Sequence, residues 1–325
     1  MIKMRSTILF FAAIGLLSMA ALQGCQQSVN GSNGAEKQPS GMEAKAAEPF
    51  KPNEAWNNYW YAGKAELTSY YLKQSRYGEI HEGTLVNVFV AEDFSKSKQV
   101  KLDDASSAGA DKQPVLKLNQ STKFNTGIYP YSIMLSAFQP IDINNYPHAV
   151  KITGSMQEWC GMAYYQMNAG KNGFDIQSRS YFESEGDRNL NFATVVQEDE
   201  LWNLIRINPD KLPKGEMKIL PGAIYLRLSH KPLEPVMATL DLRDENGIML
   251  YVIDFPTLGR KLNIRFEKNF PYKITGWDDT YAGFDGKVLT TTAVRNKEIL
   301  LDYWNAHNNA DRILREQLGL PKDTQ

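Results

Sequence analysis

The chain has 325 residues, of which 42% are hydrophobic and 22% are charged, and its formal net charge at pH 7 is −1. This composition is typical of a water-soluble globular body with an ordinary hydrophobic core rather than of a membrane-embedded chain. There is no block of basic residues that could follow a phosphate backbone, so no nucleic-acid partner is expected.

The first 24 residues have the three parts of a secretory signal peptide. Lys3 and Arg5 form a basic start, and an apolar run from Ile8 to Leu22 follows. This run is shorter than the roughly 20 residues that a transmembrane helix needs, and no stop-transfer pattern comes after it. We therefore expect residues 1–24 to be a cleaved signal peptide.

The segment Leu22-Gln23-Gly24-Cys25 resembles the lipobox of bacterial lipoproteins, in which the cysteine thiol receives a lipid. Several acyl chains on Cys25 would hold the chain firmly on a membrane, because each buried methylene contributes about 0.8 kcal/mol. Residues 25–53 are polar and cannot bury enough apolar surface to fold, so we predict a lipidated cysteine followed by a flexible tether. The predicted location is the cell envelope, on the outer membrane and facing the periplasm.

Residues 54–325 are predicted to form a β-rich body. Its first part contains six segments with period-two alternation or with many β-branched and aromatic residues, separated by short polar turns. These segments are 65–77, 84–94, 115–124, 131–141, 149–167 and 174–185. Regularly spaced strands with short returns predict an antiparallel meander.

The middle of the chain contains a predicted helix, EDELWNLIRI, with acidic residues in its first turn and Asn208-Pro209 after its end. Beyond it, the alternation of Ile224, Leu226 and Leu228 predicts a strand in GAIYLRLSH. Asn246-Gly247 lies between two alternating segments and predicts a hairpin with a type I′ turn.

A second helix is predicted from about Asn296 to Leu318, with an apolar stripe. The stripe consists of Leu300, Trp304, His307, Leu314 and Leu318. The predicted fold class is mainly β (α+β), an antiparallel meander forming an open barrel or curled sheet, with one mid-chain helix and a C-terminal amphipathic helix. The body is expected as one domain or as two halves, 54–210 and 211–325.

No catalytic motif is found, and neither a cofactor nor a metal site is expected. The best ligand-facing candidates are Trp277, Asp278 and Asp279, because carboxylates beside an indole ring suit a sugar or a hard cation. Trp159 and Tyr165 are added as aromatic residues that could line a binding concavity. Cys160 lies among aromatic residues and methionines, where a buried, unreactive thiol is expected.

The body also resembles a known family through five segments: YWYAGKAELTSYYLKQSRYGEIHEGTLVNVFVAEDF, KFNTGIYPYSIM, SMQEWCGMAYYQMN, SRSYFESEGD and ELWNLIRINPDKLP. It is similar to an uncharacterised family of bacterial envelope lipoproteins whose members often carry the label septum formation inhibitor Maf. The resemblance spans nearly all of the body and implies no assigned active site. Maf pyrophosphatases open with an S-x-S-P-R-R-type motif that this sequence lacks, so their activity is not expected here.

The sequence therefore predicts a lipoprotein attached to the membrane through Cys25, whose body binds a lipid, a glycan or an envelope protein. Two alternatives remain open. One is an envelope hydrolase that uses the carboxylates of Asp278 and Asp279. The other is a structural lipoprotein that only docks to a second envelope protein.

Overall fold

The computed structural model describes residues 48–283 and 285–322. The predicted signal peptide, Cys25 and most of the predicted tether lie outside these residues. The described part belongs to one compact unit, and within it no helix combines the length and the apolar character needed to cross a bilayer.

Fifteen strands form a single sheet within the described residues. The strands are β1 Ala65–Arg76, β2 Glu79–Ser95, β3 Lys112–Thr126, β4 Tyr129–Pro140, β5 Lys151–Glu158, β6 Gly161–Gly170, β7 Gly173–Ser180, β8 Arg188–Phe192, β9 Val196–Gln197, β10 Gly215–Leu220, β11 Val236–Glu245, β12 Ile248–Phe255, β13 Arg260–Glu267, β14 Ile274–Ala282 and β15 Val288–Leu301. Their order in the sheet is β8-β7-β6-β5-β4-β3-β2-β1-β15-β14-β13-β12-β11-β10-β9.

The sheet consists of two meanders that meet in its middle. Strands β1 to β8 are neighbours in chain order, and so are β10 to β15. The two runs are joined by the antiparallel pair β1 and β15, in which Ala65 lies opposite Leu301. All pairs are antiparallel except the short parallel pair of β9 with β10. Residues 54–210 and residues 211–325 therefore both contribute strands to the same sheet.

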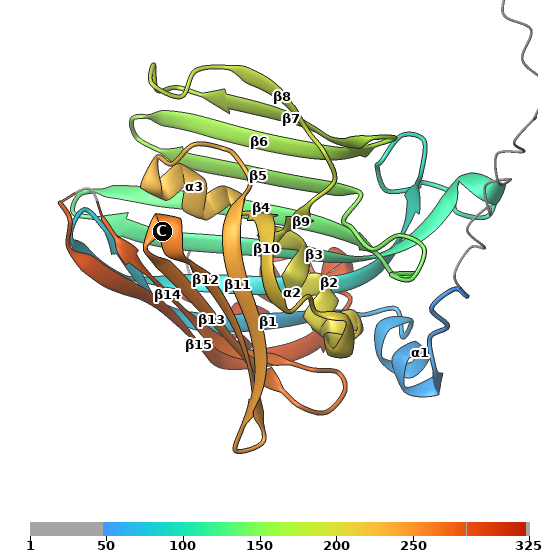
Figure 1. Cartoon of the computed structure of the whole chain (residues 1–325). Helices are drawn as coiled ribbons and strands as arrows, with labels where there is room; N and C mark the ends of the chain where they lie inside the picture. Colours follow the sequence, from blue (N-terminus) through green and yellow to red (C-terminus); the bar gives the residue numbers. More distant parts are fainter. Residues whose placement is uncertain (1–47, 284, 323–325) are drawn as a thin grey trace, which may run out of the picture. The chain divides into compact units, whose positions relative to one another are not determined.

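The two outer strands of this sheet, β8 and β9, are consecutive in the sequence. Only residues 193–195 separate them, so the chain passes directly from one edge of the sheet to the other. The sheet curls strongly, with β10 to β12 standing opposite β3 to β5, as Figure 1 shows. We call the gap between the two edges, which no hydrogen-bonded ladder closes, the seam.

Helices are few and mostly short. The α-helices are α1 Glu54–Trp60, α2 Glu198–Ile207, α3 Ala223–Ser229 and α4 Ile313–Gln317, and the 3-10 turns are η1 Gly109–Asp111, η2 Pro209–Lys211, η3 Pro256–Leu258, η4 Tyr303–Asn305 and η5 Asn309–Arg312. Helices α2 and α3 lie inside the curve of the sheet (Figure 1). All ten residues of α2 are buried, which makes this helix the centre of the core.

Two buried ion pairs fix α2 at its ends. Near its start, Glu198 receives two hydrogen bonds from Arg260 on β13, at 2.5 and 2.8 Å. Near its end, Arg206 donates two hydrogen bonds to Glu66 on β1, at 2.5 and 2.6 Å. Losing one partner of such a pair leaves a buried charge uncompensated, which costs about 3–5 kcal/mol. The position of α2 is therefore strongly specified.

Most of the predicted elements are confirmed. The mid-chain helix spans Glu198–Ile207, and the hairpin of β11 and β12 turns at Asn246 and Gly247, both with positive φ as a type I′ turn requires. The segment 149–167 forms two strands instead of one, with Trp159 and Cys160 in the turn between β5 and β6.

Two predictions are wrong. GAIYLRLSH is not a strand but contains α3, because β10 pairs directly with β11 and leaves residues 223–229 outside the ladder. The predicted helix over 296–318 is helical only after residue 302, in the short separate elements η4, η5 and α4. Residues up to Leu301 belong to β15, where they provide the hydrogen-bond partners of β1.

Candidate functional site

A small cavity lies at the seam between α3 and strands β5 to β8, and we call it the seam cavity. Its volume is about 80 Å³. The apolar side chains that line it include Met156, Ala163, Tyr165, Ile224, Leu226 and Leu233, and the charged ones are Arg179, Glu185, Arg188, Arg227 and Lys231. Arg188 and Lys231 are exposed, whereas Met156 and Leu226 are buried, so the basic residues lie at the rim and the apolar ones inside.

A second cavity, which we call the inner cavity, lies on the other side of α3 and is also about 80 Å³ in volume. Trp202 on α2, Tyr225 on α3, and Trp277 and Tyr281 on β14 provide its aromatic lining. Ile224 lines both cavities. Each cavity has room for several water molecules but is smaller than the usual 300–1,000 Å³ of ligand pockets. A larger ligand would therefore need α3 to shift, which would join the two spaces.

The inner cavity contains a buried charged cluster around Arg260. This guanidinium binds Glu198 and also donates two hydrogen bonds to Asp279, at 2.7 and 2.9 Å. Asp199, the next residue on α2, accepts a hydrogen bond of 2.9 Å from the backbone N–H of Ala223 at the start of α3. Two carboxylates thus share one arginine, and the Asp199 carboxyl belongs to the same buried cluster.

The protonation of this cluster follows from its burial. Burial, reinforced by the charge of Glu198, raises the pKa of Asp199 to about 7. Burial also raises the pKa of Asp279, against the opposing effect of Arg260. At neutral pH the Asp199 carboxyl is therefore about half protonated and can donate or accept a hydrogen bond toward the inner cavity.

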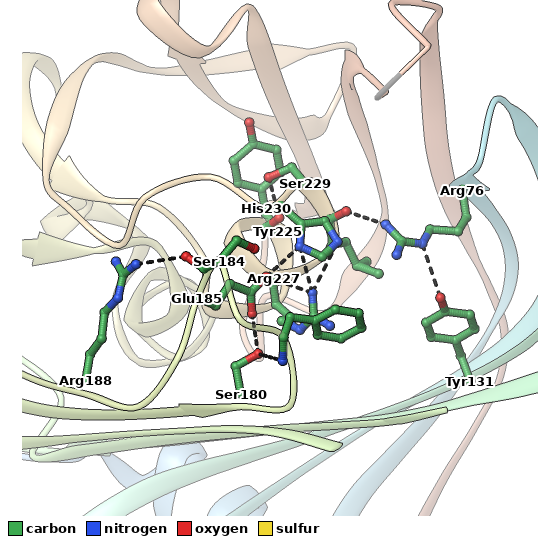
Figure 2. A network of polar contacts seen from close by, with 12 residues as sticks. Arg76, Tyr131, Ser180, Ser184, Glu185, Arg188, Tyr225, Arg227, Ser229 and His230 are labelled. Carbon is green, nitrogen blue, oxygen red and sulfur yellow. Dashed lines mark hydrogen bonds and ion pairs between the residues drawn. The ribbon is translucent and has the colours of Figure 1, made fainter. Parts of the chain in front are cut away.

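Polar contacts help to hold helix α3 in place, as Figure 2 shows. Arg76 on β1 donates to the carbonyl oxygen of Leu228 and to the hydroxyl of Tyr131. On the other side, Glu185 in the β7–β8 loop accepts a hydrogen bond of 3.1 Å from Arg227 and is 2.5 Å from Nδ1 of His230. The loop between the outermost strands is therefore tied directly to the helix that lies at the seam.

Close packing also positions α3 against the sheet. A Cβ on Gly154 of β5 would meet Ile224 and Ala223 at 3.7 and 3.8 Å, which is ordinary van der Waals contact. A Cβ on Gly222, directly before α3, would lie only 2.6 Å from Glu198 Oε1. Gly222 is thus required for the close approach of α3 to the acidic start of α2.

Three of the five predicted candidates line these cavities. Trp277 and Asp279 line the inner cavity, and Tyr165 lines the seam cavity. The other two do not. Asp278 points to the opposite face of β14, where it forms an ion pair with Arg265, and Trp159 is 67% exposed in the β5–β6 turn, where its ring stacks on that of Tyr129.

The expectation for Cys160 is wrong, because its thiol is exposed in the β5–β6 turn. This turn connects two strands of the sheet and lies outside the buried core. Among the residues that the structure describes, no group of three or more His, Cys, Asp or Glu side chains is arranged to hold a metal ion.

Sequence reasoning missed several residues of the site. Arg227 and Ile224 were placed on a predicted strand, so their positions on a helix at the seam could not be anticipated. Arg260 gave a usable signal, because it alternates with Leu262, Ile264 and Phe266 on the buried face of β13. Successive side chains of a strand point to opposite faces, so Asp278 and Asp279 must lie on opposite sides of β14.

The described residues define a mainly β protein with a large, curled and unclosed sheet around two helices. No protein-family model matches the sequence, and no curated protein matches it. Among solved structures, the chain is similar to a beta-barrel-like protein of the domain of unknown function DUF1849 from Brucella abortus. The TM-score is 0.42 at 7% identity, and the match covers 73% of this chain and 98% of that chain.

Proposed function

We propose that this protein is an envelope lipoprotein, anchored through lipid on Cys25, whose body binds a lipid-like amphipathic molecule at the seam. The observation that carries the proposal is the seam cavity, which has an apolar interior, a charged rim and a short helix as one wall. An apolar chain could enter between α3 and β5 while its polar end stays at the rim. Apolar cavities with a few placed polar groups are the usual form of small-molecule sites.

The mobile element in this proposal is α3. Its ion pair with Glu185 is partly exposed and opens at a smaller cost than the buried hydrogen bond from Arg76, so α3 would swing from its Arg76 side. Displacing Ile224 would join the seam cavity to the inner cavity and lengthen the space available to a chain. Binding and α3 movement are therefore coupled.

The hydrolase alternative receives less support from the geometry. Asp279 is bound to Arg260 inside the sheet, and Asp278 is paired with Arg265 on the other face. Two carboxylates that act on one substrate must face the same space. A pair on opposite faces of β14 does not meet that condition.

The test is native mass spectrometry of residues 26–325, purified without added ligand. We expect a co-purifying lipid in the wild-type protein, less of it in Ile224→Trp, which fills both cavities, and more in Ile224→Ala, which enlarges them. Circular dichroism establishes that each variant is folded. A ligand-free mass for all three proteins would overturn the proposal.

A further inference from the structure

The charges at the seam cavity are strongly unbalanced. Four basic side chains line it, whereas Glu185 is its one acidic lining residue. The chain as a whole is close to neutral, with a formal net charge of −1. The cationic rim is therefore a local feature, and a rim of one sign attracts a ligand group of the opposite sign.

Arg227 is the basic residue closest to the apolar interior. Its side chain is 13% exposed, and Phe182 lies under its guanidinium, 4.4 Å from Cζ to the ring centroid. Its carboxylate partner, Glu185, also contacts His230 and accepts a hydrogen bond from Ser180. The Nε–H of Arg227 is buried without an acceptor among the described residues, and a buried unpaired donor costs about 1–3 kcal/mol.

Two further cations at the rim have no carboxylate partner within the described part of the chain. Arg188 donates to the backbone carbonyl of Ser184, at 3.1 Å, and forms no ion pair. Lys231, two residues after α3, is exposed and has no side-chain hydrogen bond or ion pair among these residues. Both ammonium and guanidinium groups are thus available to an incoming anion.

We propose that the molecule bound at the seam carries a negatively charged head group, a carboxylate or a phosphate, which Arg227 and Lys231 bind while its apolar chain lies against Tyr165 and Leu226. This inference rests on the proposed function, because it names the ligand class of the same cavity. Arginine presents several donors to such an oxyanion, and lysine adds a mobile charge. An uncharged head would leave Lys231 without an ion-pair partner and would bring no negative charge to Arg227, whose Nε–H lacks an acceptor among the described residues.

The experiment measures displacement of the neutral fluorescent probe N-phenyl-1-naphthylamine from residues 26–325 after removal of bound lipid. Four ligands with one chain length are compared: dodecanoate, dodecyl phosphate, dodecanol and dodecyltrimethylammonium. We expect the two anions to displace the probe at concentrations about tenfold lower than dodecanol does, and the cation to be the weakest. The stronger of the two anions identifies the carboxylate or the phosphate as the preferred head.

The variants are Lys231→Gln and Arg227→Gln, with Arg227→Lys as the charge-conserving variant and Arg243→Gln as the control. Arg243 is paired with Asp241 on β11, away from the cavity. Lys231→Gln and Arg227→Gln should each weaken displacement by the anions about tenfold and leave dodecanol unchanged. Lys231 is exposed and unpaired, so its variant remains informative if Arg227→Gln does not fold.

The outcomes separate the two proposals. Equal displacement by the anions and dodecanol, or anion binding unaffected by both variants, overturns the charged-head inference but leaves a binding cavity. Absence of probe binding and of displacement by any of the four ligands contradicts the proposed function itself.

Discussion

The charge of the Asp199 carboxyl changes near neutral pH. It is buried between Glu198 and the start of α3, and its pKa in the folded protein is about 7. An unfolded aspartate titrates near 3.9. Between about pH 4 and pH 7 the folded state therefore holds a proton that the unfolded state has lost, so stability falls as pH rises through this window.

We expect Asp199→Asn to remove this pH dependence. Asparagine is neutral at every pH and its Oδ1 can still accept from the N–H of Ala223. The variant should be more stable than the wild type at pH 8, by on the order of a few kcal/mol, and close to it at pH 4.5. Urea unfolding at the two pH values measures the difference.

The control is Asp241→Asn, whose carboxylate is exposed on β11. Parallel stability curves for the wild type and Asp199→Asn would show that the Asp199 carboxyl is not held protonated by the fold.

At the scale of elements, α3 shows where pattern reading is insufficient. The apolar residues of this seven-residue segment fit a strand and a helix equally well. The two-residue period of a strand and the 3.6-residue period of a helix can be told apart only over longer segments. The helix is selected by its surroundings, because Gly222 allows close approach to α2 and Asp199 binds the N–H of Ala223. Both contacts come from residues distant in the sequence.

Other elements were predictable because local signals agreed. Asn246-Gly247 specified its turn, and β13 alternated without exception. The residues of the candidate site could be predicted from the sequence only in part. Trp277 and Asp279 could be proposed from composition, whereas Arg227 and Lys231 acquire a role only when the β7–β8 loop and α3 meet at the seam.

Gly222→Ala tests how tightly α3 is positioned. The added Cβ would meet Glu198 Oε1 at 2.6 Å and Asp199 Oδ1 at 3.0 Å, so either α3 or these two buried carboxyl groups must shift. We expect a loss of about 1–3 kcal/mol in stability and faster amide hydrogen exchange in residues 223–229. Exchange followed by mass spectrometry resolves this segment.

Gly154→Ala is the matched variant on the opposite side of α3, where a Cβ fits at 3.7 Å. It should leave exchange in α3 unchanged. If the two variants have equal effects, the contact between α2 and α3 does not control the position of this helix.

At the scale of the whole molecule, the anchor remains a prediction from the sequence. Cys25→Ser should lose the attached lipid, as mass spectrometry of the N-terminal peptide would show, because the residue that would carry the lipid is lost. Cys160→Ser is the control, since its thiol lies in the β5–β6 turn and carries no predicted anchor. A wild-type protein whose N-terminal peptide carries no lipid would contradict lipid anchoring.

The pairing of β1 with β15 has a consequence for how the chain reaches this structure. Strands β2 to β8 each pair with the preceding strand as they are made, but one side of β1 has no partner until β15, near the end of the chain, is complete. Contacts this distant in sequence make folding slow. Until the last strand is made, the edge of β1 is unpaired and can bind a neighbouring chain. A chain whose synthesis ends before residue 288 is therefore expected to aggregate.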